Sequence, residues 1–433
     1  MTALKDKRWW IGALGLVVVA LVVFFTLQFF RNNAPQISPA STAPASTAPA
    51  QTGPPATSTA PRSSSPGNAS VPPTQASVAP APPAPSVAEA KLAAMTLEQR
   101  VGQTLMVSSP VTGADADSLY ALDTLYVGNI FMAGRSAAGQ AGIGAEVAAI
   151  TGHVSGSRTE GARPFVATDQ EGGFVQIMRG PGFAQIPQAI EQGQLSPAEL
   201  LREATVWGQE LAAVGVTVNL APVMDTVPSA EFAPLNAPIG TFGREFGYTP
   251  AAVSSHGLAF AQGMMDAGVE PTVKHFPGLG RVTENTDVSA GVTDGITVRN
   301  DTYVAPFRDA VNAGVPWLMI SNASYPRIDP NNMAPFSRII VHDMVRGDLG
   351  FKGVIISDDI CNAVQVSSVP VSQRGVLFLE AGGTMALCTN QGLMPQIYAG
   401  MVDAARTDPA FAATIDAAAL LILQQKQAKG LID

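Results

Sequence analysis

The stretch GVIISDD, residues 353–359, shows the pattern that decides the fold: a short apolar run that ends in two carboxylates. Similar runs recur from residue 104 onward, and Ala-rich stretches with helical spacing separate most of them. The eight runs are Thr104–Val107, Asn129–Met132, Pro164–Thr168, Thr217–Ala221, Thr272–His275, Trp317–Ser321, Val354–Ser357 and Thr384–Leu387. Expected helices include Pro197–Ala213, Pro250–Ala267, Thr302–Ala313 and Ser337–Arg346. Strands that alternate with helices pair in parallel. Eight such units predict a single (β/α)8 TIM-like barrel, with a doubly wound open sheet as the alternative.

Polar residues follow most of these runs at the point where each run ends. They are Asp169, Asp225, Lys274 with His275, Asn322, Asp358 with Asp359, and Thr389 with Asn390. Catalytic residues of a (β/α)8 barrel lie at the carboxyl ends of its strands. The pattern therefore predicts a site lined by acids and cations at one edge of the sheet.

Three segments at these strand ends carry side chains suited to chemistry. DQEGG, residues 169–173, places an acid before two glycines that allow a tight turn, although an ordinary acidic turn has the same composition. KHFPGLG, residues 274–280, ends a strand with a lysine and a histidine, and a lysine is costly to bury without a partner. SDD, residues 357–359, supplies paired carboxylates that suit glycoside chemistry. Metal binding or helix capping by Asp359 is the alternative.

Seven motifs occur in a fixed order along the chain. They are MTLEQRVGQ (95–103), DQEGG (169–173), NLAPVMD (219–225), IG (239–240), REFG (244–247), KHFPGLG (274–280) and SDD (357–359). Together they resemble glycoside hydrolase family 3, in its bacterial β-N-acetylglucosaminidase (β-hexosaminidase) branch. The resemblance covers about Met95 to Ala386, and members of this branch often consist of the barrel alone.

The resemblance implies a role for each matching residue. Asp358 is similar to the family's nucleophile, which forms a covalent glycosyl-enzyme in a retaining mechanism. Asp169, Arg244, Lys274 and His275 correspond to residues that hold the hydroxyls of the terminal sugar, and charge-assisted hydrogen bonds would orient the ring. No metal, nucleotide or organic cofactor is implied.

The chain departs from the family's pattern in the loop after the Lys-His motif. This branch usually carries Asp-x-His there, and the histidine protonates the leaving oxygen. Here the loop reads ENTD, residues 284–287, and Asp287 stands at the position of the histidine. A carboxylic acid can take this role if burial or a nearby carboxylate raises its pKa. Our hypothesis is that Asp287 is the acid/base, with Glu284 as second candidate. Phe174 replaces the family's arginine after Glu-Gly-Gly, and Arg179 is close enough in sequence to compensate.

The predicted function is a retaining exo-glycosidase that removes terminal β-linked N-acetylglucosamine from cell-wall fragments of the peptidoglycan type, acting as a monomer. A β-glucosidase on the same scaffold is one alternative, because the pocket details that set the preference for the acetamido group are not in the motifs. A non-catalytic sugar-binding protein that has lost its acid/base is another. The natural leaving group, and whether phosphate replaces water, are left open.

The first 87 residues have a different composition from the rest. Trp9–Phe30 contains 22 uncharged residues, the length of a helix that spans a bilayer. It predicts an uncleaved membrane anchor with residues 1–8 in the cytoplasm and the catalytic domain outside, and a cleaved signal followed by secretion is the alternative. Residues 31–87 hold 14 prolines and predict a disordered linker rich in Pro, Ala, Ser and Thr. Residues 88–433 then form the barrel.

Charge and cysteine content exclude two classes of function. Residues 1–87 carry a net charge of +4 and the whole chain −9, so the remainder carries −13. Such an acidic domain argues against nucleic-acid binding, which needs basic patches. Cys361 and Cys388 are the two cysteines of the chain. They exclude a disulfide framework or a multi-cysteine zinc site, and they leave open one bridge or two buried thiols.

Overall fold

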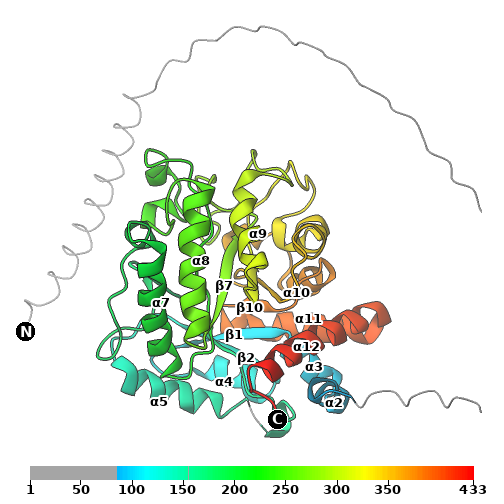
Figure 1. Ribbon diagram of the computed structural model, residues 1–433. Helices are drawn as coiled ribbons and strands as arrows, with labels where there is room; N and C mark the ends of the chain where they lie inside the picture. The colour runs from blue at the N-terminus through cyan, green and yellow to red at the C-terminus, as the bar shows by residue number, and fades with distance from the viewer. Residues whose placement is uncertain (1–84, 155) are drawn as a thin grey trace, which may run out of the picture. The chain divides into compact units, whose positions relative to one another are not determined.

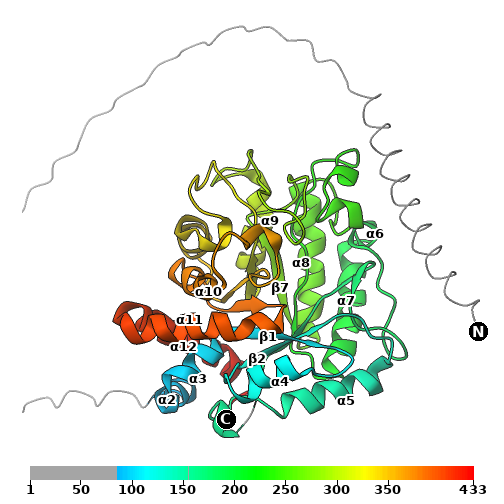
Figure 2. The ribbon, with the colours of Figure 1, turned by 180° about the vertical axis from the view of Figure 1, so that it is seen from behind.

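The computed structural model describes residues 85–154 and 156–433, and the chain described there folds as a barrel surrounded by helices (Figures 1 and 2). Eight parallel strands are hydrogen-bonded in the order β10-β1-β2-β3-β6-β7-β8-β9. They are β1 (Leu105–Pro110), β2 (Asn129–Ala133), β3 (Val166–Thr168), β6 (Val218–Asn219), β7 (Glu270–Phe276), β8 (Trp317–Ile320), β9 (Val354–Ser357) and β10 (Ala386–Cys388). A parallel pairing of Ile356 with Met385 joins the two edges, so the sheet is nearly closed. Each strand overlaps one of the eight runs. The predicted barrel is confirmed, and the open sheet is excluded.

Helices connect successive strands and cover the outside of the barrel (Figures 1 and 2). They are α2 (Val87–Ala94), α3 (Leu97–Gln103), α4 (Ala116–Asp123), α5 (Gly139–Thr151), α6 (Ala189–Gln192), α7 (Pro197–Ala212), α8 (Pro250–Asp266), α9 (Ala305–Asn312), the π-helix η6 (Ile339–Asp348), α10 (Val371–Glu380), α11 (Met394–Thr407) and α12 (Pro409–Ala428). The start of α7 shows how the sequence fixes a boundary. The Ser196 hydroxyl accepts from the Glu199 amide, and the Glu199 carboxylate accepts from the Ser196 amide, which forms a capping box.

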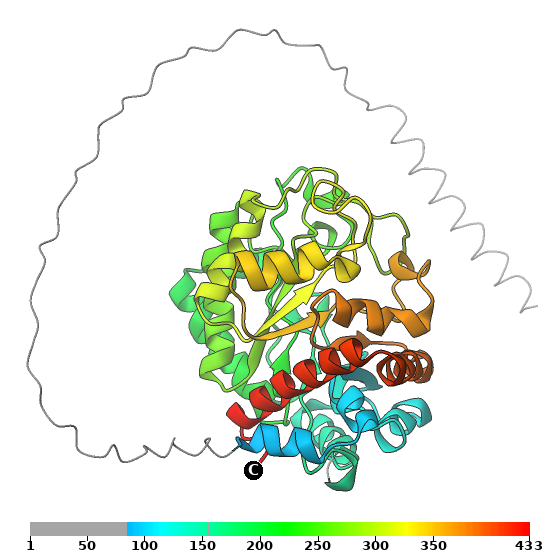
Figure 3. The same ribbon diagram turned by 90° about the vertical axis from the view of Figure 1, so that its right-hand side faces the viewer.

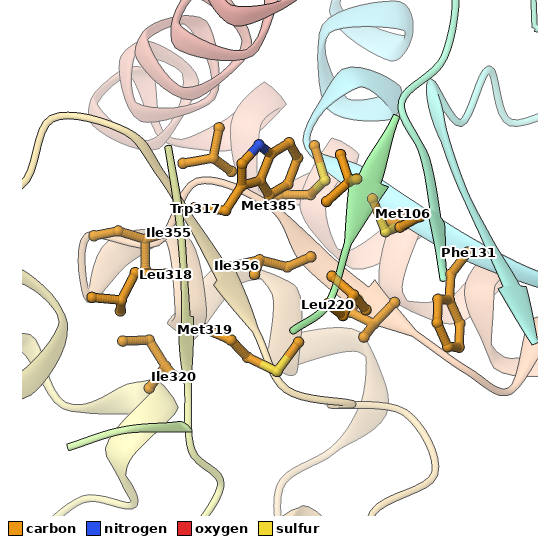
Figure 4. Close-up of a cluster of buried hydrophobic side chains, with 14 of the residues drawn as sticks. Met106, Phe131, Leu220, Trp317, Leu318, Met319, Ile320, Ile355, Ile356 and Met385 are labelled. Carbon is orange, nitrogen blue, oxygen red and sulfur yellow. The ribbon is translucent and has the colours of Figure 1, made fainter. Parts of the chain in front are cut away.

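Apolar side chains fill the barrel interior. Along β8, Trp317 and Met319 lie on one side of the strand, and Leu318 and Ile320 on the other (Figure 4). All four are buried, because β8 lies between the barrel interior and the helices outside. This is why the run reads as continuously apolar rather than alternating.

A buried lysine on α12 lies at the amino ends of the strands. The Lys426 ammonium donates to the Gln103 side-chain oxygen at 2.8 Å and to the Gly128 carbonyl at 3.0 Å, just before β1 and β2. It also lies 5.8 Å from the ring centroid of Phe165, which packs edge-on against Trp317. Helix α12 packs beside α2, next to the chain's first described residues (Figure 3). This end of the barrel is therefore closed by packing.

The predicted fold class needs one correction. It placed a transmembrane helix at residues 9–30 before a linker at 31–87, and both segments lie outside the described residues except for 85–87. Within residues 85–154 and 156–433, no helix is long and apolar enough to cross a membrane. The fold is therefore described as a (β/α)8 barrel alone, and membrane contact through residues 9–30 has no support.

Candidate active site

A cavity of about 370 Å³ opens at the carboxyl ends of the strands. Six of the seven predicted site residues line it: Asp169, Arg244, Lys274, His275, Asp287 and Asp358. Phe131, Leu220 and Met319, which belong to the core cluster in Figure 4, also line the cavity. The site is thus a polar wall of acids and cations above an apolar floor.

Lys274 and Arg244 share a buried carboxylate. The Lys274 ammonium lies 2.7 Å from Asp169 and 2.6 Å from Glu171. Arg244 donates twice to Glu171, at 2.8 and 2.7 Å, and once to the Pro238 carbonyl. Burial opposes the ionisation of Glu171, but the two cations outweigh it and hold its pKa well below its usual range. This network fixes both cations at the cavity wall without leaving a buried charge unpaired.

The two glycines of the DQEGG segment make this arrangement possible. Gly172 and Gly173 have φ angles of +113° and +55°, and the chain turns there between the short strands β4 (Gln170–Gly172) and β5 (Val175–Gln176). A Cβ atom on Gly172 would lie 2.1 Å from the Pro187 carbonyl oxygen. The turn therefore requires glycine, and it presents Glu171 to the two cations.

His275 is oriented by a carboxylate behind it. Its Nδ1 atom lies 2.6 Å from Asp225, and Asp225 also accepts the amides of His275 and Leu279 at 3.2 and 2.7 Å. Asp225 is fully buried. The bond to Nδ1 leaves Nε2 of His275 as the ring nitrogen available to a ligand.

Asp358 follows β9 and lines the cavity. Its amide donates to the Ile320 carbonyl at 2.9 Å, and the Asp359 amide donates to its carboxylate at 2.8 Å. Burial raises the pKa of Asp358 to about 6; His275 opposes this rise, and the negative charge of Asp287 adds to it. A carboxylate that is held by one backbone donor and otherwise faces the cavity is available for attack on a ligand.

The neighbouring Asp359 has a structural role. Its carboxylate accepts the amides of Cys361, Asn362 and Thr389, at 2.9, 3.1 and 3.1 Å, and the Thr389 hydroxyl. Asp359 therefore holds the turn after β9 through its backbone amides, and it does not cap a helix, because the next helix, η7 (Val364–Val366), has Ala363 as its N-cap. It ties the loop after β9 to the loop after β10.

A disulfide joins the same two loops. Cys361 and Cys388 are bonded, with their Cα atoms 5.0 Å apart, so the alternative of two buried free thiols is wrong. Arg374 donates to the carbonyls of Ile360 and Cys361 at 2.9 and 2.8 Å. Covalent and polar links therefore hold the segment that carries Asp358.

The loop with the predicted acid/base is attached to this segment. The Val364 amide donates to the Asp287 carbonyl at 3.2 Å, and the Gln365 amide to the Thr286 carbonyl at 3.0 Å. These bonds hold Asp287 at the cavity, where its charge acts on Asp358. Glu284 and Asp287 are both exposed, but Glu284 is not among the residues that line the cavity, whereas Asp287 is. The geometry thus favours Asp287 over Glu284.

Arg179 does not take the place of the family's arginine at the cavity. Its guanidinium donates to the carbonyls of Gln176 and Gly173, at 3.0 and 2.9 Å, and it is not a lining residue. Phe174 is exposed beside the lining residue Val175.

Sequence reasoning missed the partners of the predicted residues. Glu171 was quoted within a motif and Asp225 as a strand-end acid, but neither was paired with a cation or a histidine. The signal was the lysine itself, because a lysine that stays charged at a buried strand end is usually paired with carboxylates. Which acids supply the charge depends on contacts that span 105 residues for Lys274–Asp169 and 50 for His275–Asp225.

Comparison with known proteins agrees with this geometry. A family model described as the glycosyl hydrolase family 3 N terminal domain matches residues 96–424. The chain belongs to this family. It is 32% identical over 251 residues to a β-hexosaminidase from Stenotrophomonas maltophilia, covering 55% of this chain and 71% of that protein. A β-hexosaminidase from Thiobacillus denitrificans is 36% identical over 245 residues, with 54% and 65% covered.

Solved structures place the chain within the same branch of family 3. A β-N-acetylhexosaminidase from Beutenbergia cavernae is 48% identical, with a TM-score of 0.76, and the match covers 77% of this chain and 99% of that one. A family 3 β-N-acetylglucosaminidase from Paenibacillus sp. is 26% identical, with a TM-score of 0.69, and the match covers 78% and 64%. The predicted family and enzyme class are confirmed: the chain is a glycoside hydrolase of the β-hexosaminidase branch of family 3.

Proposed function

We propose that this family 3 enzyme is a retaining exo-β-N-acetylglucosaminidase in which Asp358 is the nucleophile and Asp287 the acid/base. The observation that carries the proposal is the placement of both carboxylates on one cavity, with the charge of Asp287 contributing to the raised pKa of Asp358. Repulsion between two nearby carboxylates disfavours the state in which both are ionised. Asp358 would therefore act as the nucleophile in its ionised form, above about pH 6, and Asp287 is a second carboxyl group on the same cavity that can serve as the acid.

The first step would form a covalent intermediate. The Asp358 carboxylate attacks the anomeric carbon, the bond from that carbon to the leaving oxygen breaks, and Asp287 donates its proton to the leaving oxygen. Asp169, Arg244, Lys274 and His275 hold the hydroxyls of the terminal sugar. The network that fixes Lys274 and Arg244 makes these donors rigid before substrate binds, which is how such contacts favour the transition state.

The second step would release the sugar. Asp287, now a carboxylate, takes a proton from water, and the water oxygen attacks the anomeric carbon and displaces Asp358. Two inversions at one carbon give net retention. The cavity ends on the apolar floor of Phe131, Leu220 and Met319, so it receives the end of a glycan, which supports exo rather than endo cleavage.

The disulfide bond supports a cell-wall substrate outside the cytoplasm. Disulfides persist in oxidising compartments and are rare in the cytosol, and the bond between Cys361 and Cys388 lies beside the site. We therefore place the domain outside the cytoplasm, where cell-wall fragments of the peptidoglycan type carry β-linked N-acetylglucosamine. Blocking free thiols in intact cells with a maleimide tests this placement. Because both cysteines are buried, the maleimide is present while the chain is denatured; they should resist labelling until a reductant is added, and labelling without the reductant would contradict the placement.

Hydrolysis of 4-nitrophenyl glycosides by the full chain tests the activity. The N-acetyl-β-glucosaminide should be hydrolysed much faster than the β-glucoside, and Asp358→Ala should abolish the reaction. A preference for the glucoside would favour the β-glucosidase alternative. Binding of N-acetylglucosamine without hydrolysis of either substrate would favour the sugar-binding alternative, which the replaced acid/base motif keeps open. Adding inorganic phosphate to the assay distinguishes the two reactions, because hydrolysis gives the free sugar and phosphorolysis gives the sugar 1-phosphate.

A further inference from the structure

A groove of about 510 Å³ lies at the amino ends of β9 and β10, away from the active site. Its lining residue Lys352 precedes β9 and its lining residues 382–384 precede β10, whereas Asp358 follows β9. The π-helix η6 and α12 supply further lining residues, and both helices lie on the side of the barrel that faces the viewer in Figure 3. We refer to this hollow as the amino-end groove. The lining residues that matter most are Arg346, Phe351, Lys352, Leu379, Thr384 and Ala417.

Arg346 is a cation of this groove that has no carboxylate beside it. It lies in the last turn of η6, and π-helical segments are rare and occur frequently at functional sites. Burial lowers the pKa of Arg346 to about 10, and Arg346 forms no ion pair within residues 85–154 and 156–433. In the active site, by contrast, Glu171 pairs with Arg244. Because a desolvated charge is costly without a partner, an anionic ligand would stabilise Arg346.

The groove also contains hydrogen-bond donors that remain available. A guanidinium has five N–H groups. Arg346 uses two of them for the carbonyls of Phe351 and Gly353, at 3.1 and 2.7 Å. It uses a third for the Thr384 hydroxyl, at 2.9 Å. These bonds fix the guanidinium and leave two N–H groups without a partner in the described part of the chain. The Thr384 hydroxyl accepts from Arg346 and from the Ile355 amide, so its own proton is also available to a ligand.

A second cation lines the same groove. Lys352 is exposed and forms no ion pair among the residues that the structure describes. None of the described residues that line the groove is acidic, although residues 88–433 carry a net charge of −13. Two cations without an acid, in a domain that is acidic overall, give the groove a local positive charge that favours an anion.

Most of the other lining residues are apolar. Phe351, Leu379 and Ala418 are buried, and Ala417 and Leu421 on α12 are at least partly exposed. The volume of the groove lies within the range of pockets that hold small molecules, about 300–1,000 Å³. A simple inorganic anion would contact the cations and leave this apolar surface in water. The lining therefore suits a ligand that has an apolar part as well as a charge.

We infer that the amino-end groove binds a small amphiphilic anion, namely a carboxylate or phosphate ester attached to an apolar chain. The anionic group accepts from the available N–H groups of Arg346 and from the Thr384 hydroxyl, and Lys352 adds its charge. The apolar chain packs against Phe351 and the α12 residues, which removes apolar surface from water. This site is separate from the sugar site, and the inference does not depend on the proposed function.

Calorimetry with the full chain and four simple probes tests this site. Decyl phosphate and decanoate, used below the concentrations at which they form micelles, should bind. Decyltrimethylammonium has the same apolar chain with a positive charge and should not bind. Inorganic phosphate lacks the chain and should bind about tenfold more weakly than decyl phosphate.

Variants of the lining residues test whether binding occurs in the groove. Arg346→Gln should weaken the binding of decyl phosphate by about tenfold, and Lys352→Gln by about twofold. Ala417→Trp fills the groove from an exposed position and should weaken binding by about tenfold. Ala148→Trp, at an exposed position of α5, is the matched control and should bind like the wild type. If circular dichroism shows that Arg346→Gln is unfolded, the two exposed positions Lys352 and Ala417 decide the test.

Sedimentation with phosphatidylglycerol vesicles distinguishes two sources of such an anion. Weaker retention of Arg346→Gln and Ala417→Trp than of Ala148→Trp would support a bilayer lipid as the source. Equal retention of all variants, together with calorimetric binding of decyl phosphate, would support a free amphiphile.

Three results would overturn the inference. They are no binding of either decyl anion, binding of decyltrimethylammonium or inorganic phosphate as tight as that of decyl phosphate, and wild-type affinity in both Arg346→Gln and Ala417→Trp. Because binding is measured as heat and not as hydrolysis, failure of this site and failure of the proposed function are distinguishable.

Discussion

The two ends of the barrel each bury a lysine, and the two lysines are held in opposite ways. At the carboxyl ends of the strands, burial lowers the pKa of Lys274, but Asp169 and Glu171 outweigh burial and raise the pKa above its usual value. At the amino ends, Lys426 donates to the neutral oxygens of Gln103 and Gly128. Within residues 85–154 and 156–433 no carboxylate forms an ion pair with Lys426, and burial lowers its pKa to about 7.

The difference between the two lysines shows that one end of the barrel serves the reaction and the other end serves the packing of the fold. The carboxyl end keeps a fixed positive charge in contact with a cavity, at the cost of desolvating two carboxylates. The amino end uses the same side chain to satisfy backbone and amide oxygens, and does not need its charge. The same arrangement is found in (β/α)8 enzymes generally, in which the active site lies at the carboxyl ends of the strands and the amino ends contribute to stability.

Replacing each lysine by methionine should give the largest difference in activity between the two ends of the barrel. Lys274→Met leaves Asp169 and Glu171 short of a cation, so kcat/KM on the 4-nitrophenyl N-acetylglucosaminide should fall by about 10³-fold. The free energy of unfolding in urea should also fall, by about 3–5 kcal/mol. Lys426→Met should keep wild-type activity. Comparable losses of activity in the two variants would remove the distinction between the two ends.

The sequence could predict the strands of the barrel but not the contacts that surround the two buried lysines. Each barrel strand is buried on both sides, so segments such as Trp317–Ile320 are apolar throughout and end where the chain reaches the cavity. The residues at these strand ends, Asp169, Lys274 and Asp358, could therefore be predicted as candidate site residues. The roles of Glu171 and Lys426 depend on contacts between distant parts of the chain, up to 323 residues apart for Lys426 and Gln103. The Cys361–Cys388 bond likewise depends on two neighbouring strand ends, which composition alone cannot bring together.

Removing the proposed acid/base sharpens the account of the carboxyl end. Asp287→Ala should lower kcat/KM on chitobiose, a poor leaving group, by about 10²- to 10³-fold. A 2,4-dinitrophenyl glycoside needs no protonation, so its rate should fall far less. Glu284→Ala on the same loop is the control and should behave as wild type. Equal losses on both substrates would show that Asp287 is not the acid.

The ionisation of the nucleophile should change kcat/KM with pH, and this change should be smaller than the loss caused by removing Asp287. Because the pKa of Asp358 is raised to about 6, kcat/KM for the dinitrophenyl glycoside should fall as the pH drops below about 6. Asp287→Asn removes a negative charge that raises this pKa, so the acid limb should move to lower pH. A limb that stays in place or moves to higher pH would mean that the two carboxylates do not interact.

Lys426, at the amino ends of the strands, should affect the free energy of unfolding and not the enzymatic activity. The pKa of Lys426 is about 7 when folded and about 10.4 when unfolded. Between these values the unfolded chain binds more protons, so the free energy of unfolding should rise with pH. Lys426→Met should lack that rise, and the exposed control Lys352→Met should keep it. Parallel curves for wild type and Lys426→Met in urea between pH 7 and 10 would contradict the assignment.

The central claim is that Asp358 bonds covalently to the sugar. Incubating the full chain with a 2-fluoro glycosyl donor, followed by mass spectrometry of its peptides, tests this directly. We predict one glycosyl adduct, on Asp358, that forms as activity is lost. An adduct on another residue, or loss of activity with no adduct, would contradict it.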